Sequence, residues 1–122
     1  MGRETDEQRR GARVLLAFST CPDQAAADRI AANLVSEGLA ACVNRLPGVR
    51  STYFWDGRLQ DDAEILLIIK TTDRRLPDLV ERLKALHPYE VPELVAVPVV
   101  DGNEPYLDWV RMGVGNKGAS QE

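Results

Sequence analysis

The chain has 122 residues, of which 44% are hydrophobic and 28% charged, and its formal net charge is -4. These values are typical of one soluble globular domain and exclude the disordered and fibrous classes. The acidic balance also argues against a nucleic-acid partner, because affinity for phosphate backbones depends on clustered Lys and Arg.

The two ends of the chain are expected to lie outside the folded domain. Residues 1–12 are charged and poor in apolar side chains, so they cannot repay the entropy of being ordered, and residues 114–122 have a similar character. We therefore expect a disordered charged tail over 1–12, a single domain over 13–113 and a flexible tail over 114–122.

The domain begins with a predicted strand over 13–19 and a helix that follows it. Pro22 is expected at the first helical position, where its missing N–H has no partner to lose, and Gly38 follows the end of the helix. Helical spacing is carried by the apolar residues Ala27, Ile30, Ala31 and Leu34.

A predicted hairpin occupies the middle of the chain. A strand over 39–46 resumes over 49–55, and the intervening Pro47-Gly48 is expected to mark a bend or bulge. The Asp56-Gly57 pair is a strong turn signal, so the chain is expected to return in a strand over 63–71.

The last third predicts a helix, a strand and a second helix. Asp73 is expected to be the N-cap of the first helix, which ends at His87 because the residue before a proline is pushed out of the α region. The prolines within residues 91–100 favour a strand at the edge of the sheet. Asn103 opens the last helix, in which Tyr106, Trp109 and Val110 are expected to share a face.

This order predicts an α+β fold of the ferredoxin-like split βαβ type, βαββαβ plus a C-terminal helix, with an antiparallel sheet and both long helices on one face. Residues 65–69 are apolar on both sides of their strand, whereas a half-exposed antiparallel strand alternates. The second sheet face therefore needs a cover, and a closed ring of identical copies would supply it. We expect an obligate homo-oligomer.

His87 is the only histidine, and the residues leave three roles open for it. It can be a structural residue at the end of a helix, where its partial positive charge suits the dipole. It can bind a metal, above all Cu(II), with Cys21, Glu64, Glu90 or Glu93. It can be the base for Cys21, whose place at a helix N-terminus lowers a thiol pKa. No spacing typical of a tight zinc site is present.

Other side chains have both a structural and a functional interpretation. Lys70 shares a strand face with Glu64, which favours an ion pair across subunits or an anion-binding lysine. Cys42 lies in an apolar stretch and is expected to be inert, and with only two cysteines the chain is expected in a reducing cytoplasm. The aromatic residues can either line a ligand pocket or take part in ordinary packing: Tyr53, Trp55, Tyr89, Tyr106 and Trp109.

Five segments between residues 13 and 112 carry a resemblance to a known family: STCPD, LAACVNRLPGVRSTYFWDG, KTTD, HPYEVPEL and YLDWV. Together they resemble the CutA family of divalent-cation tolerance proteins. The resemblance implies a cytoplasmic homotrimer of ferredoxin-like subunits, similar in architecture to PII-type signalling proteins. It also implies copper binding, attributed in some members to a cysteine and histidines. His87 matches the histidine of the HPY motif, whereas Ser19 and Leu86 stand where the other two ligands would fall.

With the resemblance, the chain is expected to be a non-enzymatic trimer that binds Cu(II) or another divalent cation weakly through His87, with Cys21 and Glu90, and that has no organic cofactor and no membrane-inserted segment. The expected site is a subunit-boundary cleft that also contains Lys70, Glu64, Tyr53, Trp55, Tyr89 and Glu93. One alternative is a PII-like sensor that binds an anionic metabolite or nucleotide through Lys70. Another is a scaffold that docks a partner protein through its strand edges or last helix.

Overall fold

The computed structural model describes residues 5–115. Its elements in chain order are α1 (Asp6–Arg10), β1 (Val14–Cys21), α2 (Gln24–Ser36), β2 (Cys42–Trp55), β3 (Arg58–Thr72), α3 (Leu76–Leu86), β4 (Val95–Pro98) and α4 (Glu104–Gly113). The strands form one antiparallel sheet in the order β2-β3-β1-β4, which is the split βαβ arrangement. The predicted α+β fold is confirmed. Within the described residues no helix is long and apolar enough to span a bilayer.

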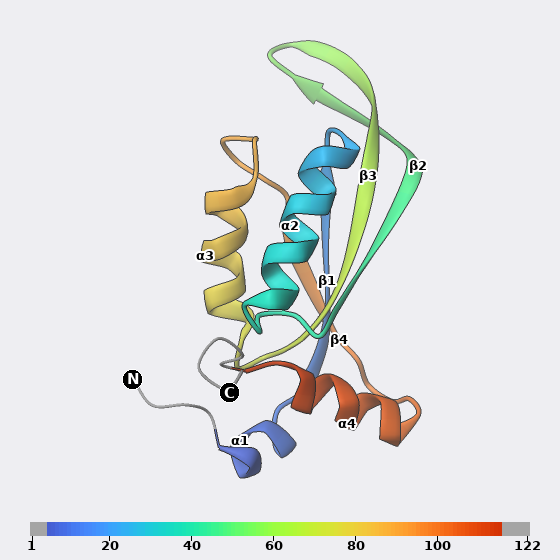
Figure 1. The fold of residues 1–122 in the computed structure, drawn as a ribbon. Helices are drawn as coiled ribbons and strands as arrows, with labels where there is room; N and C mark the ends of the chain where they lie inside the picture. Colours follow the sequence, from blue (N-terminus) through green and yellow to red (C-terminus); the bar gives the residue numbers. More distant parts are fainter. Residues whose placement is uncertain (1–4, 116–122) are drawn as a thin grey trace.

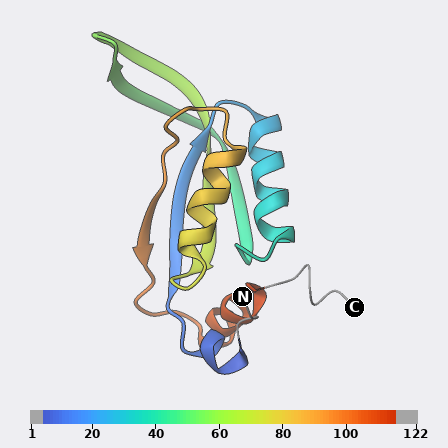
Figure 2. The same cartoon turned by 90° about the vertical axis from the view of Figure 1, so that its left-hand side faces the viewer.

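The helices α2 and α3 lie side by side on one face of the sheet, as Figures 1 and 2 show from two directions. Their apolar stripes meet the odd-numbered side chains of β1 and β3, since successive side chains of a strand point to opposite faces. The fully buried members of this core include Ala17, Ile30, Leu34, Leu67, Ile69, Leu79 and Leu83.

The start of α2 differs from the prediction. The helix begins at Gln24, because the Asp23 carboxylate accepts a hydrogen bond from the N–H of Ala26 at 2.8 Å and thereby becomes the N-cap. Pro22 therefore precedes the cap instead of occupying the first helical position. The apolar stripe is where it was predicted, since Ala27, Ile30, Ala31 and Leu34 are all buried.

The start of α3 also differs, because Asp73 is not its N-cap. The helix begins at Leu76 after Arg75, and no side chain caps it. The Asp73 carboxylate instead accepts a hydrogen bond from the backbone N–H of Arg13 at 3.0 Å, which ties the end of β3 to the start of β1. The helix ends before His87, which has extended backbone angles as its position before a proline predicted.

The strands β2 and β3 form a long hairpin whose tip projects beyond the sheet (Figure 1). Asp56 and Gly57 both have positive φ, at 55° and 73°, which confirms the tight turn predicted for this pair. The predicted irregularity at Pro47-Gly48 is a bulge between Leu46 and Val49. The return strand is longer than predicted, since it begins at Arg58, directly after the turn.

The second face of the sheet is largely open, and α4 covers only one end of it. Leu107 and Val110 of α4 pack with Val14 and Ala41 in a small second core. Elsewhere the face carries apolar side chains of β1, β3 and β4, and we call this set the open face: Leu16, Phe18, Leu66, Ile68, Val95 and Val97. The edge strand β4 contributes the last two and is shorter than the predicted 91–100.

Three expectations about the ends of the domain need correction. Tyr106 and Trp109 do not share the buried face of Val110; they stack on each other with ring centroids 5.6 Å apart and remain exposed. The expected tail over 1–12 contains the short helix α1, because Thr5 and Gln8 form a reciprocal capping box. Val114, expected in the second tail, is buried against α4. The remaining tail residues, 1–4 and 116–122, lie outside the described part.

Candidate functional site

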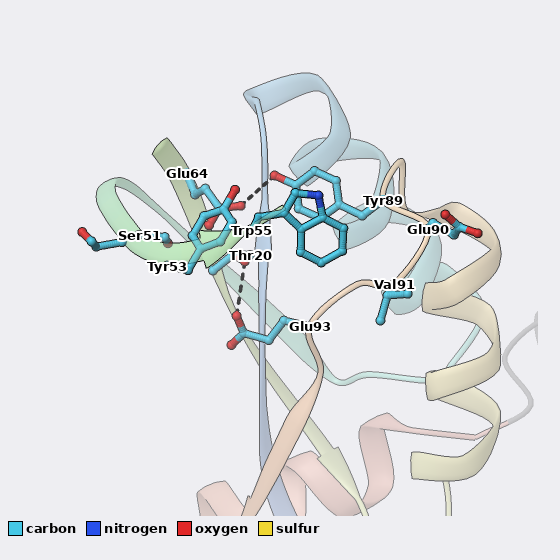
Figure 3. A pocket seen from close by; sticks show the side chains of 10 residues that line it. Thr20, Ser51, Tyr53, Trp55, Glu64, Tyr89, Glu90, Val91 and Glu93 are labelled. Carbon is cyan, nitrogen blue, oxygen red and sulfur yellow. Dashed lines mark hydrogen bonds between the residues drawn. The ribbon is translucent and has the colours of Figure 1, made fainter. Parts of the chain in front are cut away.

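A pocket of about 760 Å³ opens beside the hairpin, where β2, β3, the end of β1 and the segment between α3 and β4 meet (Figure 3). Its lining contains six of the residues expected in the site: Tyr53, Trp55, Glu64, Tyr89, Glu90 and Glu93. Thr20, Ser51, Thr52 and Val91 complete it. Of the expected residues, His87, Cys21 and Lys70 are not part of the lining.

Glu64 is the buried carboxylate of this pocket, with only 8% of its surface exposed. Its Oε2 accepts a hydrogen bond from the hydroxyl of Tyr89 at 2.7 Å, so β3 and the α3–β4 segment are joined across the pocket (Figure 3). Burial and this bond to the carboxylate raise the pKa of Tyr89 well above its ordinary value. Tyr89 is therefore a neutral hydrogen-bond donor to Glu64.

Glu93 is held on the opposite wall by the end of β1. The hydroxyl of Ser19 donates to the backbone carbonyl of Glu93 at 2.7 Å, and the hydroxyl of Thr20 donates to its Oε1 at 3.3 Å. Ser19 stands where the resemblance puts a metal-binding cysteine, yet it is fully buried and its hydroxyl is committed to this backbone bond. Its observed role is to position the segment that carries Glu93.

The hairpin supplies two aromatic walls. The hydroxyl of Tyr53 donates a hydrogen bond to Oδ2 of Asp62 on the neighbouring strand, and that bond is the main cause of the raised pKa of Tyr53. Trp55 is 67% exposed, so its indole is free to meet a ligand in the pocket. Asp62 was not expected from the sequence. Only the β2–β3 register, which sets it beside the Tyr53 strand, brings it to the site.

His87 lies behind the pocket and is 7% exposed. Its Nε2 is 2.7 Å from the carbonyl oxygen of Thr20, which can only accept, and its Nδ1 is 3.1 Å from the backbone N–H of Tyr89, which can only donate. These partners assign a neutral ring with the proton on Nε2. Both nitrogens are thus used by backbone groups, and this arrangement does not fit the metal-ligand role expected for His87.

The other candidate donors do not join His87 either. Within the described residues, no group of three or more His, Cys, Asp or Glu side chains is arranged to hold a metal ion. Cys21 is fully buried and forms no hydrogen bond with His87 there, so the cysteine and histidine pair needed for nucleophilic catalysis is not assembled. Glu90 is exposed, and its carboxylate points away from the pocket centre in Figure 3.

Within one chain, Lys70 lies at the other end of the open face from the pocket. It stands opposite Leu16 and Cys42 in the sheet, and its Nζ is 5.8 Å from the ring centroid of Tyr106 in α4. Six residues along β3 separate it from Glu64, which at the rise of a strand is about 20 Å. An anion held by Lys70 would therefore not occupy the pocket, and an anion in the pocket would meet carboxylates instead.

The fold and the pocket define a small α+β protein of the ferredoxin-like type with a ligand-sized hollow beside its long hairpin. Residues 15–112 match the family model described as CutA1 divalent ion tolerance protein. The chain belongs to this family, which confirms the resemblance seen in the sequence.

Individual relatives agree with this assignment. The divalent-cation tolerance protein CutA of Thermus thermophilus is 53% identical over 96 residues, which cover 79% of this chain and 93% of the relative. A solved structure of the Thermus thermophilus protein matches with a TM-score of 0.81 at 50% identity and covers 84% of this chain and 99% of that one. Protein CutA 1, chloroplastic, of Oryza sativa is 47% identical over 97 residues, or 80% of this chain and 55% of that relative.

Proposed function

We propose that this protein acts in the response to divalent cations by binding, without catalysis, and that its binding site is the pocket beside the hairpin. The observation that carries the proposal is the charge of the lining, which contains the carboxylates of Glu64 and Glu93 and, among the described residues, no lysine, arginine or histidine. Such a lining favours a positively charged ligand. Membership of a family described by divalent ion tolerance supports the same conclusion.

Binding of Cu(II) or a similar ion at this pocket is expected to be weak. Glu64 and Glu93 are the carboxylates that the surrounding hydrogen bonds hold in place, and two carboxylates leave most of the coordination shell to water. His87 acts in this proposal as a positioning residue, because it fixes the backbone at Thr20 and Tyr89 on two sides of the pocket.

The proposed assembly is a homotrimer. The open face supports association, since Phe18, Leu66 and Ile68 stand together on a face that no described helix covers along its length. The number of subunits, three, is what the family resemblance implies. We further place the protein in a reducing cytoplasm, because Cys21 and Cys42 are both free thiols.

Isothermal titration of the purified protein with CuCl2 tests the site. We expect Glu64→Gln to weaken copper binding several-fold, because it removes the buried charge and keeps an acceptor for Tyr89. Glu81→Gln, on the exposed side of α3, is the matched control and should bind like the wild type.

His87→Ala decides between the two possible positions of the metal. If copper binding is lost in His87→Ala but unchanged in Glu64→Gln, the ion sits at the histidine and the pocket proposal is wrong. If neither variant differs from the wild type, copper has no specific site of either kind.

A further inference from the structure

The pocket is larger than a metal ion needs. Its volume of about 760 Å³ lies well within the range of roughly 300–1,000 Å³ that is usual for sites of small organic molecules. Its walls are also not those of a simple acidic patch, because Tyr53, Trp55, Tyr89 and Val91 contribute ring faces and an apolar surface next to the carboxylates. A ligand that fills this space therefore has a carbon body as well as a charge.

The charge that such a ligand must carry follows from Glu64. More than nine-tenths of this residue is buried, and the hydrogen bond that it accepts comes from the neutral hydroxyl of Tyr89. No cationic side chain lines the pocket within the described part of the chain. A carboxylate removed from water is costly unless a positive charge pairs with it, so Glu64 favours a ligand that brings a cation.

The aromatic side chains specify what kind of cation this is. Ammonium groups bind well over the faces of Trp and Tyr, whereas a divalent ion keeps its water and prefers oxygen ligands. The hydroxyls of Tyr53 and Tyr89 both donate to carboxylates, Asp62 and Glu64, which keeps the two rings close to negative charge. Figure 3 shows these rings, the Trp55 indole and Glu64 gathered around the same hollow.

We propose that the pocket binds an organic ammonium ion, a small amine or quaternary ammonium compound whose charged nitrogen pairs with Glu64 and whose carbon atoms pack on Trp55 and Tyr89. The inference rests on the proposed function only in that both use this pocket as a cation site. It assigns a ligand class that the acidic lining alone does not define.

The test is isothermal titration of the intact protein with two probes, choline chloride and n-butylammonium chloride, and with 3,3-dimethylbutan-1-ol, the uncharged carbon analogue of choline. We expect saturable binding of at least one ammonium probe and binding of the alcohol that is about tenfold weaker than that of choline, because the alcohol lacks the charge. Equal binding of choline and its uncharged analogue, or no saturable binding of either ammonium probe, overturns the inference.

Two tryptophan variants localise the site. Trp55→Leu is expected to weaken ammonium binding about tenfold, whereas Trp109→Leu is the matched control, since Trp109 is similarly exposed but lies on α4 outside the pocket. Equal effects of the two variants contradict the assigned position. Circular dichroism of both variants should match the wild type, because each replaces an exposed side chain.

The CuCl2 titration separates this inference from the proposed function. Glu64→Gln should weaken the binding of both copper and the ammonium probes, because both cations are proposed to pair with this carboxylate. Copper binding that depends on Glu64 with no ammonium binding overturns only the ligand class. Ammonium binding that depends on Glu64 without copper binding overturns only the metal part of the proposed function.

Discussion

Two opposing effects act on the pKa of the Cys21 thiol, burial and the N-terminus of a helix, and burial is the stronger one. The residue comes just before α2, and helix N-termini commonly lower thiol pKa values. Here burial, together with the nearby carboxylates of Glu64 and Asp23, raises the pKa of Cys21 from 9.0 to about 11. The catalytic role that the sequence left open for Cys21 with His87 would need an activated thiol, and the buried position of the sulfur does not provide one.

This raised pKa predicts a loss of stability in alkali. Below about pH 9 the thiol is protonated in both states, but between pH 9 and about 11 it ionises in the unfolded chain and not in the folded one. We expect the free energy of unfolding to fall by roughly 1–2 kcal/mol over this interval from this group. Urea unfolding of wild type and Cys21→Ala at pH 8 and pH 10.5 measures it.

The alanine variant should show a shallower decline than the wild type, whatever its stability at neutral pH. Cys42→Ala is the control for the second, half-buried cysteine and should keep the wild-type slope. Identical slopes in all three proteins would refute the assignment to Cys21.

The positions and roles of single site residues could be predicted only in part from the sequence. Alternation along β3 correctly put Glu64 and Lys70 on one face, but it carries no information on distance along the strand, so both were assigned to one cleft. The HPYEVPEL motif drew attention to His87, yet only the structure shows that backbone groups of Thr20 and Tyr89 occupy both ring nitrogens. Long-range partners of this kind leave no local signal.

Among the elements, the end of α2 depends most closely on a glycine. Gly38 has a φ of +74°, and its carbonyl accepts a hydrogen bond from the N–H of Gly115 at 2.8 Å. A Cβ at position 38 would lie 1.6 Å from the carbonyl oxygen of Gly115. The chain after α4 therefore packs against the end of α2 only while residue 38 has no side chain.

Gly38→Ala and Gly57→Ala separate this contact from backbone strain. Gly57 has nearly the same φ, +73°, but nothing lies within 4 Å of the Cβ it would gain. Both variants should lose roughly 1–2 kcal/mol from the positive φ, and Gly38→Ala should lose more because backbone must also move. Thermal unfolding compares them, and equal losses would show that the contact with Gly115 is unimportant.

The hairpin illustrates which elements a sequence specifies. Its turn was predictable because Asp56-Gly57 has the positive φ angles that such turns need. Residues 58–62 were not predicted as strand, since all of them except Leu59 are polar. Their pairing with the end of β2, from Trp55 opposite Arg58 to Ser51 opposite Asp62, comes from the turn, which sets the register without any buried face.

At the scale of the whole molecule, the open face predicts how substitutions affect assembly. We expect Ile68→Asp to yield insoluble protein or a poorly folded monomer. In the proposed assembly Ile68 is covered by another copy, and burying a polar group without a partner costs roughly 2–7 kcal/mol. Sedimentation velocity with circular dichroism is the measurement. Ala85→Asp, on the exposed surface of α3, is the control and should sediment like the wild type.

A soluble, fully folded monomer from Ile68→Asp would contradict the proposal that association stabilises the fold. The apolar character of this sheet face was predictable from the sequence. Residues 65–69 lack the alternation of apolar and polar residues that a strand with one face in water shows. The sequence did not predict that α4 would cover one end through Leu107 and Val110, because a short amphipathic helix can dock at several places.

The positions of α1 and α4 have a practical consequence. These helices contact each other at the end of the sheet opposite the projecting hairpin, as Figure 1 shows, and Arg111 of α4 donates a hydrogen bond to the carbonyl of Ala12 at 2.9 Å. A surface anchor, affinity tag or fluorescent reporter attached at α1 or α4 would lie at the end of the sheet opposite the hairpin. Immobilised-protein assays can thus keep the support at a distance from the hairpin that carries Trp55.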